Sequence, residues 1–203
     1  LIPNVSTRRW ERRHSYSTTE SRSLPDMLLV IDSSGSMEWV IRRSFLSGPF
    51  HLALLSAFAA MDYVLQRGVR VAAINFSDAA LVTPWTRERR VLERVLMSYQ
   101  GGGTVLPVDE IEQMSRRAGG PALVLMITDA EVANWEEMID CVRSLSRRGH
   151  SLFLFHIGGA SDRHDAVGRA LRAAGAEVIG VSEVKDLVGL VVKTVRDRYP
   201  STA

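Results

Sequence analysis

Three side chains with oxygen atoms follow a strongly apolar run near the start of the sequence. Asp32, Ser34 and Ser36 stand at alternate positions after residues 27–31, and Gly35 among them permits a tight turn. An uninterrupted apolar run of this length is typical of a strand that is buried on both faces of a parallel sheet. Open α/β sheets bind ligands at the carboxyl ends of such strands, so we expect the function here.

Two further stretches carry the same kind of chemistry later in the chain. Thr104 follows three glycines at 101–103, and Asp129 follows the most apolar strand candidate, residues 122–128. If the strands that precede Asp32 and Asp129 are neighbours, both carboxylates face one crevice. The glycines lack Cβ atoms, so their loop can approach the first loop closely and carry Thr104 toward the other oxygen atoms.

The five side chains together offer two carboxylates and three hydroxyl groups, with no His or Cys among them. Such an all-oxygen set fits a hard divalent cation, Mg²⁺ with Mn²⁺ or Ca²⁺ as alternatives, and argues against zinc or copper. Two acidic and three neutral ligands leave one or two coordination positions of such a cation to water, so an unsaturated cation at the surface attracts a carboxylate from outside. The candidate metal ligands are Asp32, Ser34, Ser36, Thr104 and Asp129.

Each stretch alone also has a simpler interpretation. The Asp-x-Ser-x-Ser pattern at 32–36 is compatible with a turn that caps a helix. The glycines at 101–103 are compatible with a flexible connector, or with a phosphate cradle built from backbone N–H groups. Asp129 could cap the segment that follows it. The order of the three stretches within the whole chain is what favours a common site.

Strand and helix candidates alternate along most of the chain with short connections. The strand candidates are residues 27–31, 70–76, 79–85, 122–128, 151–157 and 177–181. The helix candidates are residues 51–66, 87–97, 108–117, 135–148, 165–174 and 184–199, and residues 38–49 are expected to be irregular. This alternation requires a mostly parallel sheet with helices on both faces. Pro84 favours an antiparallel edge strand, so we predict a doubly wound, six-stranded α/β sheet with one antiparallel edge strand.

Composition restricts the class of protein further. The 203 residues are 46% hydrophobic and carry a formal charge of +2, which is typical of one globular domain with no nucleic-acid or membrane partner. No apolar run approaches the ~20 residues of a membrane span. A single cysteine excludes an internal disulfide and favours a cytoplasmic location. Polar residues 1–24 are predicted to be an extension or linker before a domain at 25–203, and the first residue, Leu1, suggests a fragment of a longer polypeptide.

The remaining polar candidates have structural interpretations. His156 lies in an apolar run and is predicted to be a core or strand-end histidine, whereas His150 is predicted to lie at the surface. Thr86 and Asn134 are predicted to cap the helices that follow them. Cys141 lies in an amphipathic segment and is expected to be a small buried residue rather than a nucleophile.

Taken together, the motifs resemble the metal-site loops of the von Willebrand factor A (vWA) domain family, which includes the integrin inserted domains. The motifs are D-S-S-G-S-M at 32–37, F-S-D at 76–78, G-G-G-T at 101–104 and I-T-D at 127–129, and the likeness spans roughly residues 25–199. The resemblance implies a doubly wound sheet with a metal-ion-dependent adhesion site (MIDAS) at its top. The five candidate ligands would contact the cation there, and an Asp or Glu of a partner protein would complete its coordination.

The sequence departs from the family pattern after the third aspartate. Family members often have Gly at the next position, whereas here Asp129 is followed by Ala130 and Glu131. Glu131 adds a carboxylate near the predicted site. It could face solvent, which is the simplest interpretation, join the water shell of the cation, or weaken an acidic partner by repulsion.

Three functions are compatible with these features. The first is a divalent-metal-dependent protein-binding module, which by resemblance to cytoplasmic prokaryotic members of the family could serve an AAA-type ATPase of the MoxR kind. The second is a Mg²⁺-dependent phosphoryl-transfer or hydrolytic enzyme with Asp32 as nucleophile. The third is a structural interaction module with a vestigial metal site. The sequence contains no P-loop and no Gly-x-Ser-x-Gly motif, so we predict a binding module and not an enzyme.

Overall fold

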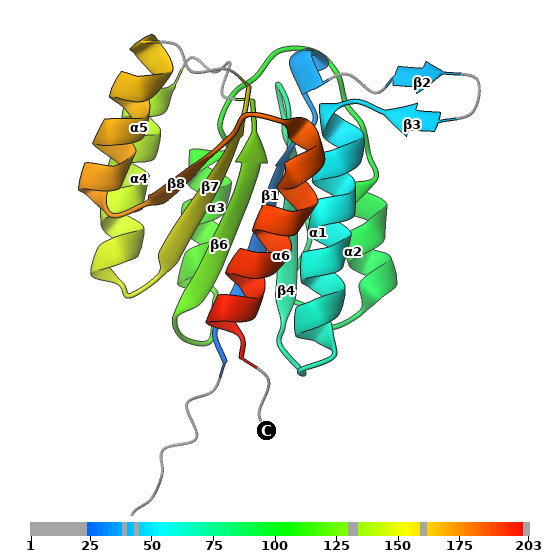
Figure 1. The fold of residues 1–203 in the computed structure, drawn as a ribbon. Helices are drawn as coiled ribbons and strands as arrows, with labels where there is room; N and C mark the ends of the chain where they lie inside the picture. The colour runs from blue at the N-terminus through cyan, green and yellow to red at the C-terminus, as the bar shows by residue number, and fades with distance from the viewer. Residues whose placement is uncertain (1–23, 38–39, 43–44, 130–133, 159–161, 201–203) are drawn as a thin grey trace, which may run out of the picture.

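The computed structural model describes residues 24–37, 40–42, 45–129, 134–158 and 162–200 (Figure 1). The main sheet has the order β5-β4-β1-β6-β7-β8, and every neighbouring pair is parallel except β4–β5. Its strands are β1 Asp26–Asp32, β4 Val71–Phe76, β5 Ala80–Val82, β6 Ala122–Thr128, β7 Ser151–Ile157 and β8 Glu177–Val181. The predicted six-stranded, mostly parallel sheet with one antiparallel edge strand is therefore confirmed.

Helices cover both faces of this sheet (Figure 1). The helices α1, α2 and α6 pack on one face and α3, α4 and α5 on the other. Their bounds are α1 Pro49–Leu65, α2 Arg89–Leu96, α3 Val108–Arg116, α4 Trp135–Arg147, α5 Asp162–Ala174 and α6 Leu187–Arg198, with short 3₁₀ turns η1 Gly35–Met37 and η2 Val184–Asp186. Among the described helices, none is long and apolar enough to cross a membrane.

The central position of β1 in the sheet explains why its sequence is apolar without interruption. Met27, Leu29 and Ile31 pack into the core beneath α1 and α6. Leu28 and Val30 point to the opposite face and pack into the core beneath α3 and α4. All five side chains have no solvent-accessible surface, because alternate residues of a strand face opposite sides and both sides are covered by helices.

Residues 38–49 were predicted to be irregular, and this prediction was wrong in part. They include a small antiparallel hairpin of β2 Val40–Arg42 and β3 Phe45–Ser47, which projects from the main body beside η1 (Figure 1). Strands of three residues are too short to show the alternation by which a strand is recognised in a sequence. The hairpin pairs only with itself in the described residues and does not extend the main sheet.

The N-cap of α2 is Glu88 and not Thr86, which the sequence predicted. The helix begins at Arg89 with Glu88 at its N-cap, and the Oγ1 of Thr86 accepts the backbone N–H of Glu88 at 2.9 Å. The backbone of Thr86 pairs instead with Val71, through N–H to C=O distances of 2.8 and 2.9 Å. Pairing with β4 therefore prevents Thr86 from starting the helix.

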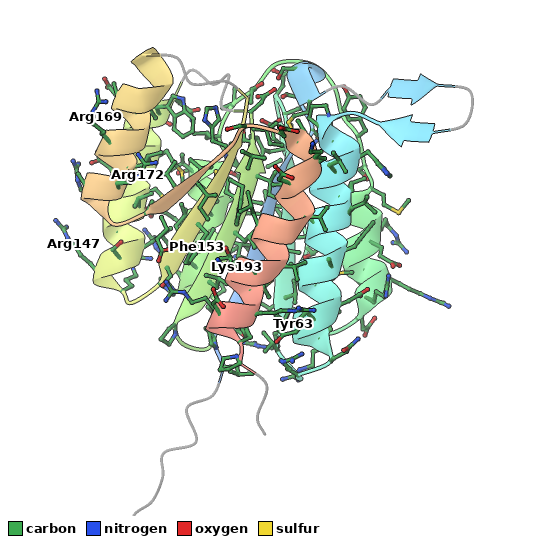
Figure 2. The ribbon with its side chains drawn as sticks, in the orientation of Figure 1. Tyr63, Arg147, Phe153, Arg169, Arg172 and Lys193 are labelled. Atoms are coloured by element: carbon green, nitrogen blue, oxygen red, sulfur yellow. The ribbon has the colours of Figure 1, made fainter. Side chains whose placement is uncertain are left out.

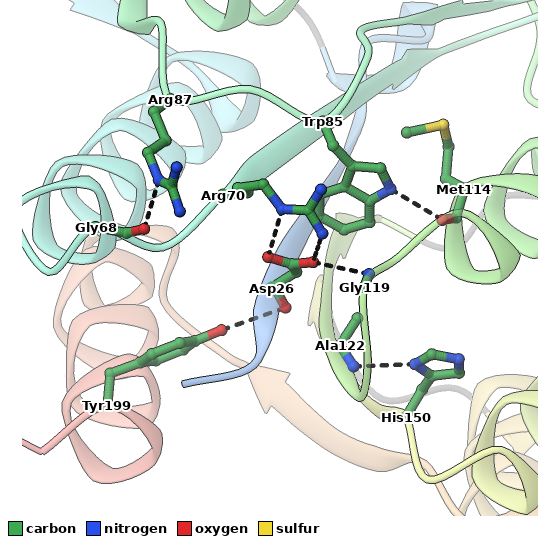
Figure 3. Close-up of polar contacts among 10 residues, drawn as sticks. All are labelled: Asp26, Gly68, Arg70, Trp85, Arg87, Met114, Gly119, Ala122, His150 and Tyr199. Atoms are coloured by element: carbon green, nitrogen blue, oxygen red, sulfur yellow. Dashed lines mark hydrogen bonds and ion pairs between the residues drawn. The ribbon is translucent and has the colours of Figure 1, made fainter. Parts of the chain in front are cut away.

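His150 is a buried residue, contrary to the prediction that it lies at the surface. It stands directly before β7, and its Nδ1 accepts the backbone N–H of Ala122, the first residue of β6, at 2.9 Å (Figure 3). Burial lowers the pKa of the imidazole, and the positive charge of Arg148 lowers it further. The neutral ring therefore links the starts of two neighbouring strands, and protonation of Nδ1 would remove the acceptor.

We expect His150 to make the stability of the domain depend on pH. The pKa of His150 is lower in the folded state than its ordinary value of about 6.5. The neutral ring therefore contributes its full stabilisation to the folded state above about pH 6.5, and this stabilisation is lost as the pH falls through the lower pKa of the folded state. Urea unfolding between pH 7.5 and pH 5 should show this loss in the wild type and a weaker dependence in His150→Gln. His51→Gln, the control on α1, should keep the wild-type dependence, and an unchanged profile in His150→Gln would contradict the prediction.

Candidate functional site

The first and third predicted loops lie side by side at one edge of the sheet. The strands β1 and β6 are parallel neighbours, with Ile31 opposite Ile127, so both strands end at the same edge. The neighbour of β1 on its other side is β4, so the strand order reverses between β1 and β6, which is the position where open α/β sheets bind ligands. Asp32 closes β1 and Asp129 directly follows β6, as the sequence predicted.

Asp32 is a buried carboxylate that accepts hydrogen bonds from Ser34 and Thr128. Its Oδ1 accepts the backbone N–H of Ser34 at 2.9 Å, and its Oδ2 accepts the hydroxyl of Thr128 at 2.5 Å. Burial raises the pKa of Asp32, the hydrogen bonds from Ser34 and Thr128 oppose that shift, and the negative charge of Asp129 adds to it. Within the described residues, no ion pair involves Asp32.

The two predicted serine ligands lie next to each other. The hydroxyl oxygens of Ser34 and Ser36 are 3.2 Å apart, and Ser34 is buried whereas Ser36 is exposed. The turn η1 brings them together, since the N–H of Met37 donates to the carbonyl of Ser34 at 3.1 Å. Met37 is fully buried and anchors the turn from below, so the serine pair is held at the boundary between core and solvent.

The glycine loop packs directly on the first loop. The N–H of Gly35 donates to the carbonyl of Gly102 at 2.9 Å, and the N–H of Gly101 donates to the carbonyl of Ser33 at 2.9 Å. A Cβ atom on Gly35 would lie 3.1 Å from the Gly102 oxygen, so a larger residue would push the loops apart. Thr104 is half-buried two residues further on, and no hydrogen bond in the described structure joins it to Asp32 or to the two serines.

A buried amide beneath the loops was missed by sequence reasoning. The Oδ1 of Asn75, in β4, accepts the hydroxyl of Ser33 at 2.5 Å and the Nε2 of Gln100 at 2.9 Å. Its Nδ2 donates to the carbonyls of Val95 and Leu96 at 3.1 Å each, where α2 ends. Asn75 is fully buried, and the one signal in the sequence is an amide within an otherwise apolar strand.

Two further polar side chains hold the glycine loop from the outside. The Oδ2 of Asp78 accepts the N–H of Gly103 at 3.0 Å, and a Cβ on Gly103 would come within 2.5 Å of the other Asp78 oxygen. Asn134 occupies the predicted N-cap position of α4, but its side chain makes no capping hydrogen bond. It binds Leu106 instead, accepting its N–H at 2.9 Å and donating to its carbonyl at 3.1 Å.

The structure places the first and third candidate loops at the same edge of the sheet, and the glycine loop packs on the first loop. Asp32, Ser34 and Ser36 share one turn, and the charge of Asp129 is close enough to affect the pKa of Asp32. His156 supports the third loop, because its Nε2 lies 3.2 Å from the carbonyl oxygen of Asp129, in agreement with the prediction of a strand-end histidine. Glu131 lies outside the described residues.

These residues fit a hard divalent cation. The available donors are carboxylate and hydroxyl oxygens, which Mg²⁺, Mn²⁺ and Ca²⁺ prefer. A buried carboxylate beside a second one is unfavourable unless a positive charge lies nearby. No protein cation pairs with Asp32 in the described structure, so a bound metal ion would offset a cost that the hydrogen bonds from Ser34 and Thr128 offset only in part.

Comparison with known proteins shows the fold. No family model matches the sequence, and no curated protein matches it by sequence. Among solved structures, the pilus adhesin SpaC from Lactobacillus rhamnosus GG is similar over 88% of this chain and 31% of the adhesin, with a TM-score of 0.69 and 12% identity. The VWA domain of SpRpn10 is similar over 85% of this chain and 95% of that domain, with a TM-score of 0.64 and 13% identity.

A third similar structure comes from the mussel byssus. Proximal thread matrix protein 1 from the mussel byssus is similar over 85% of this chain and 47% of the matrix protein, with a TM-score of 0.64 and 13% identity. The chain therefore spans less than half of the matrix protein and less than a third of the adhesin. The strand order and the likeness to the VWA domain together show a vWA-like, Rossmann-like fold.

The contact between Asp78 and the glycine loop gives a testable prediction. Gly103→Ala should destabilise the domain by about 0.5–1.5 kcal/mol, because the new Cβ would displace the exposed Asp78 carboxylate from its hydrogen bond with the Gly103 N–H. Most of that cost should disappear when Gly103→Ala is combined with Asp78→Gly, and urea unfolding of the double-mutant cycle measures the difference. Gly120→Ala is the matched control, since nothing lies within 4 Å of its added Cβ. Equal costs of Gly103→Ala with and without Asp78 would disprove the collision.

Proposed function

We propose that this protein is a divalent-metal-dependent protein-binding module that docks a partner protein through a MIDAS. The observation that carries the proposal is the buried Asp32 carboxylate, which lies beside the Ser34–Ser36 hydroxyl pair and near Asp129 and has no ion pair in the described structure. The similarity of the fold to vWA domains supports the proposal. One of the similar structures is an adhesin, which also supports the proposal, and the adhesive function itself is known only for that protein.

The proposed cofactor is Mg²⁺, with Mn²⁺ and Ca²⁺ as alternatives, held by Asp32, Ser34, Ser36, Thr104 and Asp129. When bound, the ion would supply a positive charge with a coordination position for a carboxylate of the partner. The side chains of the protein orient the ligands and determine which side of the site is open to solvent. Thr128 orients the Asp32 carboxylate, and the exposed Ser36 hydroxyl lies at the side that faces solvent.

The partner that this chemistry fits is a protein that presents an Asp or Glu side chain. The resemblance to cytoplasmic members of the vWA family motivates an AAA-type ATPase of the MoxR kind as that partner, and a cytoplasmic location for the complex. The single buried cysteine agrees with a reducing compartment. We propose no nucleic-acid or membrane partner, because the chain is close to neutral.

We propose a binding role rather than an enzymatic one. Both oxygens of Asp32, the candidate nucleophile of the enzyme hypothesis, already accept hydrogen bonds, from Ser34 and from Thr128. A carboxylate held in this way is stabilised as an oriented anion, which suits a ligand of a cation better than an attacking group. Phosphate release from a panel of phosphomonoesters, measured with and without Mg²⁺, tests this choice, and Mg²⁺-dependent release would show an enzyme instead of a binding module.

Calorimetric titration tests the metal site directly. Mg²⁺ should bind the chelator-treated wild type saturably, and Asp32→Asn should weaken binding by at least about tenfold, because an oriented charged ligand is lost. Asp140→Asn is the control, since Asp140 is an exposed carboxylate on α4. Circular dichroism and thermal unfolding would verify that both variants fold. Mg²⁺ uptake by Asp32→Asn at the wild-type affinity would remove Asp32 from the site.

Capture of the partner tests the docking role. The immobilised protein should retain a specific partner in Mg²⁺ and release it in a chelator, and Ser36→Ala should reduce retention because Ser36 is an exposed candidate ligand. Ser182→Ala, an exposed serine after β8, is the matched control and should retain the partner fully. Once the partner is identified by mass spectrometry, replacing its contacting Asp or Glu should abolish binding. Retention that is equal in Mg²⁺ and in chelator would refute a metal-dependent contact.

A further inference from the structure

The strand β5 forms an edge of the main sheet, and no strand of the described residues pairs with its outer side. The strand order places β4 on its inner side and ends the sheet at β5. The N–H of Thr83, directly after β5, donates to the carbonyl of Ala73 in β4 at 2.9 Å. Because backbone groups of successive residues alternate in direction along an antiparallel strand, those of Ala80 and Val82 point away from β4.

The two edges of the sheet differ in how they are protected. At the other edge, Arg172 of α5 donates to the carbonyl of Val178 in β8 at 3.0 Å (Figure 2). The sequence of β5 is apolar, and Leu81 and Val82 are exposed. An open apolar edge strand favours pairing with another chain, and proteins usually block it with charged residues or proline. Here Pro84 follows the strand, so it limits such pairing to the residues before it without preventing it.

Two hollows lie along this edge, both between β5 and α3. The first has a volume of about 250 Å³ and is bounded by Ala80 and by the first turn of α3. The second has a volume of about 400 Å³ and is bounded by Val82 and by Met114 near the end of α3. The indole Nε1 of Trp85 donates to the carbonyl of Met114 at 3.1 Å and so fixes one wall of the second hollow (Figure 3). A chain paired with β5 would therefore direct alternate side chains toward the two hollows.

The two hollows differ in charge. The described lining of the first contains four carboxylates and no Lys or Arg, and none of the four makes an ion pair in the described structure. The carboxylates are those of Asp78, Asp109, Glu110 and Glu137. The second hollow is lined mainly by apolar side chains, and Arg117 is its one described charged residue. The first hollow therefore attracts a positive charge, whereas the second suits an apolar group.

The arrangement of the carboxylates favours a basic side chain over a metal ion. Among the described residues, no three of His, Cys, Asp or Glu converge closely enough to hold a metal ion. Carboxylates that are spread around a hollow suit a guanidinium or ammonium group, which carries several N–H donors. A second copy of this chain, paired through the same edge, would offer only Arg117 from its own hollows to these four carboxylates. The charge therefore favours a different partner.

We propose that the β5 edge binds an extended segment of a partner protein, which pairs with β5 as an additional strand and places a Lys or Arg in the first hollow. An apolar side chain of the same segment occupies the second hollow. Backbone hydrogen bonds supply affinity in this kind of recognition, and the hollows for alternate side chains supply specificity. The interaction requires no metal ion, so it goes beyond the metal-dependent docking proposed for the Asp32 site.

Two blocked octapeptides test the proposal by calorimetry on the full chain, with a chelator present. Both peptides have threonine at every second position. At the other positions one has two valines followed by two lysines, and the other has the lysines first. The valine-first peptide should bind saturably and more tightly, because it matches the order of the hollows when it pairs antiparallel to β5, the more stable arrangement. The chain has a formal charge of +2, so attraction of a cationic peptide must be local.

Backbone methylation of the peptide tests strand pairing itself. The residues opposite Ala80 and Val82 direct both their side chains toward α3 and their backbone groups toward β5, so they are the valines and lysines of the peptide. N-methylation of the inner valine and lysine should weaken binding by about tenfold or more, because paired donors are lost. N-methylation of two threonines is the matched control, since their N–H groups point away from β5, and it should leave the affinity unchanged.

Variants of the protein test the acidic hollow. Asp109→Asn combined with Glu110→Gln should weaken binding of the valine-first peptide by about tenfold or more, because two charged acceptors are lost. Glu136→Gln is the matched control, since Glu136 is an exposed carboxylate in the first turn of α4 that does not line the hollow. Thermal unfolding would verify that the variants fold, and a peptide with glutamates in place of lysines should lose binding to the wild type by the same charge argument. Asp32→Asn should bind the peptide as the wild type does, so failure of one proposal leaves the other intact.

Four results would overturn the proposal. The first is the absence of saturable binding of the valine-first peptide at millimolar concentration. The second is equal affinity of the two methylated peptides, which would exclude strand pairing. The third is equal weakening in the Asp109/Glu110 variant and in Glu136→Gln, which would exclude the acidic hollow. The fourth is a dimer of the chain in ultracentrifugation that Val82→Lys converts to a monomer, which would assign this edge to a second copy of the chain.

Discussion

The parallel pairing of β1 with β6 is the constraint on which the candidate site depends. Both strands are apolar and covered by helices on two faces, so their alignment is stabilised by the whole core. That alignment forces Asp32 and Asp129 to emerge at the same edge although their charges repel each other. Thr128, the last residue of β6, donates a hydrogen bond to Asp32, the last residue of β1, and so fixes the orientation of the Asp32 carboxylate. The hydrophobic core thus supplies the energy that keeps an electrostatically unfavourable arrangement in place.

The loops above the sheet are supported from two sides. Below them, Asn75 connects the first loop, the end of α2 and the residue before the glycines through hydrogen bonds to side chains and backbone. From outside, Asp78 and Asn134 bind the backbone on either side of Thr104. Asn134, at the start of α4, therefore joins the segment that carries Thr104 to the helix that follows Asp129 in the chain.

The sheet and the position of the site could be predicted because both depend on local patterns. The apolar run of β1 and the regular alternation of strands and helices are visible over a few residues, and Asp32 directly ends its strand. Asn75, Asn134 and His150 could not be interpreted correctly, because each binds a backbone group or side chain at least 20 residues away. The β2–β3 hairpin escaped notice because its strands have three residues each. A polar cavity at the start of β1 is lined by residues 24–26, 67–70, 87 and 119–121, and no spacing in the sequence reveals that these four segments meet.

The direction of β1 has a mechanical consequence. The strand starts at Asp26, near the end of the molecule where α6 also finishes, and runs through the centre of the sheet to Asp32 (Figure 1). A load applied at the Asp32 loop and resisted at the start of β1 would pull along the strand axis. The hydrogen bonds to β4 and β6 lie across that axis, so they would be sheared together on both sides instead of opening one after another. A domain built in this way resists tension along its own central strand more strongly than tension that peels an edge.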